Sequence, residues 1–228
     1  MAEQRCGMCG RLADAHDRHV RFRLPEPVLT SPGQEKVPGA WLSHDSPETS
    51  PDARSAESAI LVPVPEAEPV VGRLRDRLDR AALWGVPPHV TVLFPFAATD
   101  AITGAVIERA AAAVASVRAF ECEFARVCWF GEDVVWLAPE PAGPFRALTN
   151  RVHAAFPQFP PFGGVYADVV PHLTIGHGPG GGSAALRAAE AEVTPALPVR
   201  TQVRHAWLMT GTPALASWRV VAELPLGT

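Results

Sequence analysis

Two short segments of this 228-residue chain carry histidine and threonine in the same arrangement. One reads PHVTV and the other PHLTI, and both are apolar, strand-like runs in which a proline precedes the histidine. Because side chains alternate between the faces of a strand, His89 and Thr91 share one face of the first segment. His172 and Thr174 share one face of the second. We therefore predict two strands that each present an imidazole and a hydroxyl on the same side.

Two imidazoles and two hydroxyls in one cleft are suited to phosphoryl chemistry without a metal ion. One neutral imidazole takes a proton from an attacking hydroxyl or water, and the other, protonated, donates to the leaving oxygen; each step contributes roughly 10² to 10⁴ in rate. The threonine hydroxyls can donate hydrogen bonds to non-bridging phosphate oxygens, and such neutral donors favour a singly charged phosphodiester. One His-x-Thr alone is typical of an ordinary half-buried strand, so the repetition is what indicates a site.

The elements that must position these motifs follow from hydrophobic periodicity and turn residues. We predict four helices, over 70–85, from Thr99 or Asp100 to 117, over 144–156 and from Ser183 to 193. We predict strands over 59–64, 89–96, 120–130, 134–140, 172–175, 199–209 and 218–224. Each half of this order holds a strand, a helix and a terminal hairpin. This doubled plan predicts an α+β fold with two pseudo-symmetric lobes of antiparallel or mixed sheet, outer helices and a central cleft.

The composition limits the class of protein. The net charge is −4 and Lys36 is the only lysine, which argues against a basic stripe that grips long nucleic acid. The chain has no run of about 18 apolar residues and no apolar core of a signal peptide near its start. We expect a cytoplasmic monomer with no cofactor, no metal and no membrane partner. Reduced cysteines are expected, with Cys122 and Cys128 in the core.

Residues 1–56 are expected to form an N-terminal extension outside the folded domain, which we place at 57–228. Residues 24–58 are rich in Pro, Ser, Glu, Asp and Gly and follow no period of 3.6 or 2, which predicts a flexible linker. Further upstream lie four residues of the types that bind zinc, although their spacing is shorter than in the familiar fingers. These are Cys6, Cys9, His16 and His19. The alternative is an incidental set in a tail.

The paired motifs HVTV and HLTI resemble those of the two-histidine (2H) phosphoesterase superfamily, and especially of the 2′-5′ RNA ligase family. The resemblance covers about residues 57–228. It implies a bilobal α+β fold with a central groove and no metal. It also implies cleavage of 2′,3′-cyclic phosphates of nucleotides or RNA ends to 2′-phosphates, or the reversible making and breaking of 2′-5′ phosphodiester bonds.

By motif position, the resemblance implies that His89 and His172 are the general acid and base. It implies that Thr91 and Thr174 bind phosphate. Which histidine is the base stays open. Many relatives have an arginine shortly after the second motif, whereas this chain has His177, which would hold phosphate more weakly and in a pH-dependent way.

Several other residues could contribute to a substrate site. Phe94, Phe162 and Tyr166 could stack on a base, although packing is the favoured role of Phe94. Tyr166, the sole tyrosine, precedes the second motif and is a substrate-binding candidate together with His177. His205 is read as a core or cleft-wall residue. Two alternatives stay open: a non-catalytic module that holds a nucleotide or phosphorylated metabolite in the same groove, and a zinc-dependent protein whose chemistry lies near the N-terminus.

Overall fold

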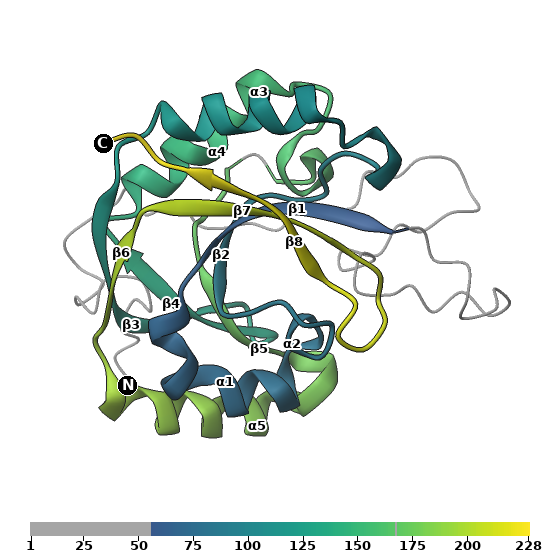
Figure 1. Ribbon diagram of the computed structural model, residues 1–228. Coiled ribbons are helices and arrows are strands. Elements are labelled where there is room, and N and C mark those ends of the chain that lie inside the picture. Colours follow the sequence, from purple (N-terminus) through teal and green to yellow (C-terminus); the bar gives the residue numbers. More distant parts are fainter. Residues whose placement is uncertain (1–55, 167) are drawn as a thin grey trace, which may run out of the picture. The chain divides into compact units, whose positions relative to one another are not determined.

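The computed structural model describes residues 56–166 and 168–228, which belong to one compact unit (Figure 1). The four candidate zinc ligands and almost all of the predicted linker lie outside the described residues. Within the described part, the strands form two four-stranded sheets in which neighbouring strands are antiparallel.

The first sheet has the order β2-β1-β7-β8 and the second the order β5-β4-β3-β6. The strands of the first sheet are β2 (His89–Leu93), β1 (Glu57–Pro63), β7 (His205–Gly211) and β8 (Arg219–Pro225). Those of the second are β5 (Leu173–His177), β4 (Val134–Glu140), β3 (Phe120–Phe130) and β6 (Val199–Val203). The strands β2 and β5, which carry the motifs, are thus edge strands of different sheets.

The prediction of one strand over 199–209 was wrong, because this segment forms two strands of different sheets. β6 pairs with β3, β7 pairs with β1, and the chain passes between them at Arg204. The core-facing positions change at the break: Val199 and Val203 of β6 lie in the main hydrophobic cluster, whereas in β7 it is Ala206 and Leu208. The sequence shows this only as a continuous apolar run over 206–209, which simple alternation does not explain. One sheet is built from the middle four strands and the other from the first two and the last two, rather than from two halves of the sequence.

Helices cover the outer faces of both sheets, and none of the described helices is long and apolar enough to cross a bilayer. They are α1 (Glu68–Leu78), α2 (Arg80–Leu83), α3 (Gly104–Ala115), α4 (Gly143–Ala155) and α5 (Gly178–Val193), with short 3-10 turns at Pro65–Ala67, Thr99–Ala101, Pro161–Gly164 and Thr194–Ala196. Helices α3 and α4 contact each other and the first sheet, whereas α1 and α5 contact each other and β5 (Figure 1). The α+β class is therefore confirmed.

The helix predicted over 70–85 is broken at Asp79. This residue has an extended backbone, with φ −128° and ψ 110°, and it separates α1 from α2. Its carboxylate accepts a hydrogen bond from the Ala81 N–H at 3.0 Å and so caps the N-terminus of α2. The helical period runs across the break, which is why the sequence predicts one helix.

Two helix starts also differ from the prediction. Thr103, rather than Thr99 or Asp100, caps α3, because its hydroxyl accepts the Val106 N–H while the earlier residues form a 3-10 turn. Element α5 begins at Gly178, within the segment expected as a glycine-rich turn, but its backbone breaks at Gly182, with φ 65° and ψ 165°, so a helical turn over 178–181 precedes the helix predicted from Ser183.

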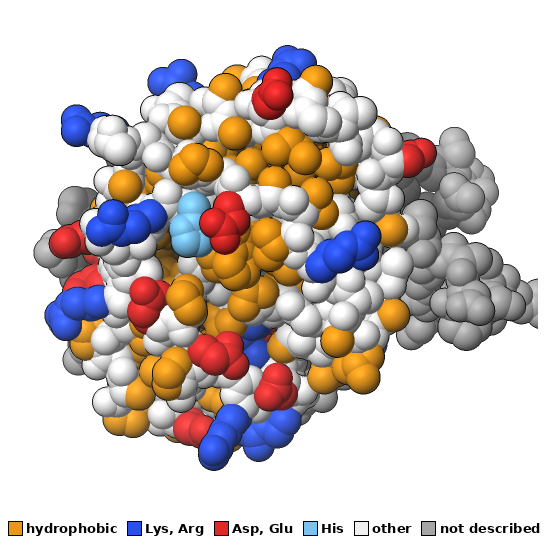
Figure 2. All heavy atoms as spheres, in the orientation of Figure 1, with side chains coloured by type: hydrophobic (Ala, Val, Ile, Leu, Met, Phe, Trp, Pro, Cys, Tyr) orange, Lys and Arg blue, Asp and Glu red, His pale blue; other side chains and the backbone are white. Residues whose placement is uncertain are grey.

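Charged side chains are dispersed over the face shown in Figure 2. Arg side chains (blue) lie mostly toward the rim, with acidic side chains (red) and hydrophobic ones (orange) between them, and the described residues of this face form no continuous basic stripe.

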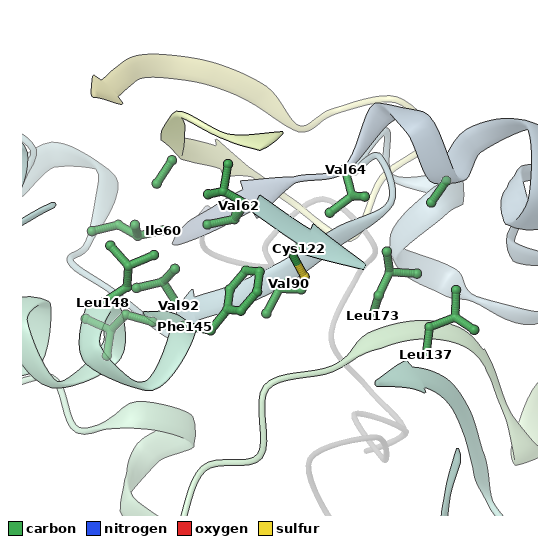
Figure 3. Packing of buried hydrophobic residues seen from close by; sticks show 14 of the residues in the cluster. Ile60, Val62, Val64, Val90, Val92, Cys122, Leu137, Phe145, Leu148 and Leu173 are labelled. Carbon is green, nitrogen blue, oxygen red and sulfur yellow. The ribbon is translucent and has the colours of Figure 1, made fainter. Parts of the chain in front are cut away.

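One hydrophobic cluster joins elements of both sheets. Figure 3 shows Val92 of β2 beside Leu148 and Phe145 of α4, and Leu173 of β5 near Leu137 of β4. The residues between His and Thr in the two motifs, Val90 and Leu173, have no exposed surface in this cluster. Each motif strand is therefore fixed by its apolar face, which leaves the other face for the polar residues.

Candidate active site

The two motifs come together where the sheets meet. His89 and Thr91 lie on β2, Thr174 lies on β5, and His172 immediately precedes β5. Strands β2 and β5 have Cα atoms within 8 Å of one another, although they belong to different sheets. A positive charge on His172 would lower the pKa of His89. The structure thus places all four motif residues at one junction, each half-buried.

The backbone orients both imidazoles in the same way. His89 Nδ1 lies 2.8 Å from the carbonyl oxygen of Pro87, and His172 Nδ1 lies 2.7 Å from that of Val170. Each carbonyl belongs to the residue two positions earlier, which the intervening proline restricts to an extended conformation. Because a carbonyl only accepts, Nδ1 carries the hydrogen of the neutral ring and Nε2 has the free lone pair. Both rings therefore offer Nε2 for proton transfer.

Burial keeps both imidazoles neutral to lower pH than usual. Burial lowers the pKa of His89 to about 4; the Arg75 guanidinium lowers it too, against the opposite effects of the Pro87 carbonyl and the Asp79 carboxylate. Burial also lowers the pKa of His172, which the Val170 carbonyl and Asp79 counteract. A phosphate anion bound beside the two imidazoles would favour the protonated form of either ring.

The threonine hydroxyls hold no partner among the described residues. Neither Thr91 nor Thr174 makes a side-chain hydrogen bond there, and both side chains are half-buried on the histidine face. Thr91 is opposite Leu61 of β1, and Thr174 is opposite Trp136 of β4. Both hydroxyls are thus able to donate to a ligand between the strands.

A buried ion pair lies at the break between α1 and α2, beside the histidines. Arg75 donates from Nε and a terminal nitrogen to Asp79 Oδ2 at 3.1 and 2.8 Å, and from its other terminal nitrogen to the Val86 carbonyl at 3.2 Å. The side chains are 2% and 1% exposed. His177, at the end of β5, places Nδ1 3.6 Å from Asp79 Oδ1. This pair was missed because charged residues in an amphipathic helix are ordinarily solvent-exposed.

An aromatic wall adjoins His172. The rings of Phe130 and Trp136 stack with centroids 4.7 Å apart, and both meet the His172 ring edge to face, at 5.0 and 5.8 Å. Trp136 shares a sheet face with Thr174, since the two residues are paired across β4 and β5. Its buried indole N–H has no hydrogen-bond partner in the described structure. Sequence reasoning missed both aromatics, because they read as alternating hairpin residues.

The aromatic candidates from the sequence lie at the other end of β2. The Phe162 N–H donates to the Phe94 carbonyl at 2.6 Å, and the Phe162 and Tyr166 rings meet edge to face at 6.0 Å. Phe94 packs against a small hydrophobic cluster. His205 is half-buried and stacks on Trp207 at 6.0 Å.

The prediction that Cys122 and Cys128 lie in the core is confirmed, since both are buried and free, whereas Cys6 and Cys9 lie outside the described residues. A separate cavity of about 440 Å³ has a strongly acidic lining that would repel phosphate. It is lined by Glu66, Glu121, Cys122, Glu123, Glu140, Arg200, Thr201 and Gln202. Among the described residues, no group of three or more His, Cys, Asp or Glu side chains could hold a metal ion.

We compared the chain with family models, curated proteins and solved structures, and the family models identify its family. A comparison with curated proteins finds no significant match. Among solved structures, the chain is similar to E. coli LigT in apo form (15% identity, TM-score 0.48, 77% of this chain and 100% of that chain) and complexed with 3′-AMP (14%, 0.47, 76% and 99%). A third is described as a phosphoesterase (14%, 0.43, 75% and 99%). Residues 62–212, more than half of the sequence, match the 2′-5′ RNA ligase superfamily, and the chain belongs to this superfamily.

Proposed function

We propose that this protein is a phosphodiesterase that opens 2′,3′-cyclic phosphates of nucleotides or RNA ends to 2′-phosphates. With a 5′-hydroxyl in place of water, the same chemistry makes a 2′-5′ phosphodiester bond, and its reverse breaks one. The observation that carries the proposal is the pair of imidazoles at the junction of the two sheet edges, each with Nδ1 at a backbone carbonyl and Nε2 left for proton transfer. Membership of the superfamily supports phosphodiester chemistry.

In the proposed hydrolysis, a water oxygen bonds to phosphorus and the bond from phosphorus to O3′ breaks. One Nε2 takes the proton of the water, and the other Nε2 gives its proton to O3′, so a 2′-phosphate and a 3′-hydroxyl result. We assign His89 as the base, because the fixed positive charge of Arg75 disfavours its protonated form. His172 is then the acid.

The hydroxyls of Thr91 and Thr174 donate to the non-bridging phosphate oxygens in this proposal. They come from opposite sheets, so they can hold two different oxygens and set the phosphorus between the two imidazoles. Neutral donors match the single negative charge of a cyclic diester.

Turnover of 2′,3′-cyclic AMP in excess chelator, with the product identified by chromatography, tests the proposal. We expect 2′-AMP and a fall in kcat of about 10² to 10⁴ for His89→Ala and for His172→Ala. His153→Ala is the matched control, because this histidine lies on α4 and contacts the Phe159 carbonyl instead. Undiminished turnover in either site variant would overturn the acid and base roles.

The alternatives give different results in the same assay. No turnover of any phosphodiester, with retained nucleotide binding, would favour the non-catalytic module. Loss of turnover in chelator would favour a metal-dependent mechanism. An RNA pair with a 2′,3′-cyclic end and a 5′-hydroxyl end distinguishes ligation from hydrolysis, because only ligation lengthens the RNA.

A further inference from the structure

Packing of α1 against β5 does not by itself require the buried ion pair between Arg75 and Asp79. A helix that only covers β5 could use an apolar side chain at position 75, since burying two charges costs desolvation free energy that the pair barely recovers. Both groups are instead retained with nearly no exposed surface. Asp79 Oδ2 is occupied by Arg75, whereas Oδ1 contacts the Ala81 N–H and points toward His177. The carboxylate of the ion pair therefore lies beside the imidazole of His177.

His177 is placed to meet a phosphate. It lies three residues beyond Thr174 on the same strand, and its side chain is 30% exposed although Asp79 is buried. Nδ1 is directed to Asp79, so Nε2 is the ring atom left for a ligand. Charged groups reach it from several elements: Asp79 and Arg75 of α1, Arg80 of α2, His172 before β5, and Asp133 on the turn before β4, whose carboxylate lies near Gly178.

We propose that Asp79 and His177 form a carboxylate–imidazole dyad that binds the substrate phosphate and takes up one proton as the phosphate binds. Substrate contact is the role of His177, and Asp79 is a positioning residue that acts through it. The inference rests on the proposed function, since it assumes that the junction holds a phosphodiester.

The charge balance explains why the proton arrives with the ligand. Arg75 already pairs with Asp79, so a proton on His177 adds a partly buried positive charge that Asp79 offsets only in part in the free protein. A phosphate anion supplies the missing negative charge. Burial accordingly lowers the pKa of His177, as do Arg75 and Arg80, while Asp79 raises it. A permanently charged arginine at this position would bind phosphate without this proton uptake.

The test measures sulfate binding, because sulfate carries no titratable proton between pH 5.5 and 8 and needs no turnover. Calorimetry in two buffers of different ionisation enthalpy gives the number of protons taken up on binding. For the wild type we expect uptake, and affinity that falls by up to about tenfold per pH unit above the pKa of His177. At pH values above the pKa of His177 in the free protein, His177→Arg should take up as much as one proton fewer than the wild type, and it should keep its affinity at pH 8.

Two further variants sharpen the result. Asp79→Asn should shift the pH range of uptake downward, because loss of the carboxylate removes the group that favours protonated His177. His153→Gln is the control and should behave as the wild type. Equal proton uptake in wild type and His177→Arg would overturn the dyad, whether or not Asp79→Asn folds.

The same measurements separate this inference from the proposed function. If sulfate binding takes up a proton through His177 but cyclic nucleotides are not turned over, the dyad is supported and the proposed hydrolysis is contradicted. Turnover of cyclic nucleotides, together with equal proton uptake in the wild type and in His177→Arg, would support the hydrolysis and overturn the dyad.

Discussion

Arg75→Met is expected to destabilise the protein strongly, although methionine has a similar length and suits a helix. The substitution leaves the Asp79 carboxylate, 1% exposed, with the Ala81 N–H as its remaining short contact apart from His177 at 3.6 Å. Removing one partner of a buried ion pair costs about 3–5 kcal/mol, because the other charge stays buried and uncompensated. In a domain of this size each kcal/mol lowers Tm by about 2–4 °C, so a fall of roughly 6–20 °C is expected.

Removing both charges should be less harmful than removing one. The double variant Arg75→Met/Asp79→Leu has no buried carboxylate, and its main losses are the cap of α2 and the Arg75 hydrogen bond to the Val86 carbonyl, about 1 kcal/mol each. Arg200→Met is the control, because its 3.3 Å pair with Glu123 is 72% and 40% exposed and contributes about 0–1 kcal/mol. Urea and thermal unfolding at pH 7, followed by circular dichroism, measure the differences. A single variant as stable as the wild type, or a double variant no more stable than the single one, would refute this reasoning.

Three further predictions concern the site itself. Thr91→Val and Thr174→Val should each lower kcat/KM on a cyclic nucleotide by about tenfold to a hundredfold, the equivalent of one hydrogen bond to a charged group, and an unchanged value would exclude phosphate contact. Because both imidazole pKa values are lowered and the acid must be protonated, kcat/KM should be highest below pH 6.5 and fall as pH rises; an optimum above pH 8 would contradict the roles of His89 and His172. Trp136→Phe should change the free energy of unfolding by less than about 1.5 kcal/mol, since it removes a buried N–H without a partner, whereas Trp136→Ala should cost about 3–5 kcal/mol in urea titrations.

The motif strands could be predicted from the sequence because a local pattern determines them. Alternation alone gives the shared face of His89 and Thr91 and the burial of Val90, and the same holds around Leu173. The carbonyl contacts of the two imidazoles follow from the proline before each histidine, but their geometry is not visible in a residue pattern.

The rest depends on contacts between distant segments. The pattern over 199–209 does not reveal that β6 pairs with β3 and β7 with β1, because these partner strands lie far away in the sequence. Arg75 is buried only because α1 contacts β5, so its charge meets Asp79 and Val86 instead of solvent. The spacing of Arg75 and Asp79, four residues apart on a helix, is the local signal that could have indicated the pair.

The sheet order also determines when the site can form during synthesis. In the first sheet β2 pairs with β1 alone, and β1 depends on β7 for its other edge. A two-stranded sheet is marginal in water, and a nascent chain emerges from its N-terminus. The strand that carries His89 therefore leaves the ribosome long before β7 and β8, which lie within residues 205–225. Translation of these two strands completes the first sheet, so a chain stalled before residue 205 would hold the first histidine motif on β2 with β1 alone as its partner strand.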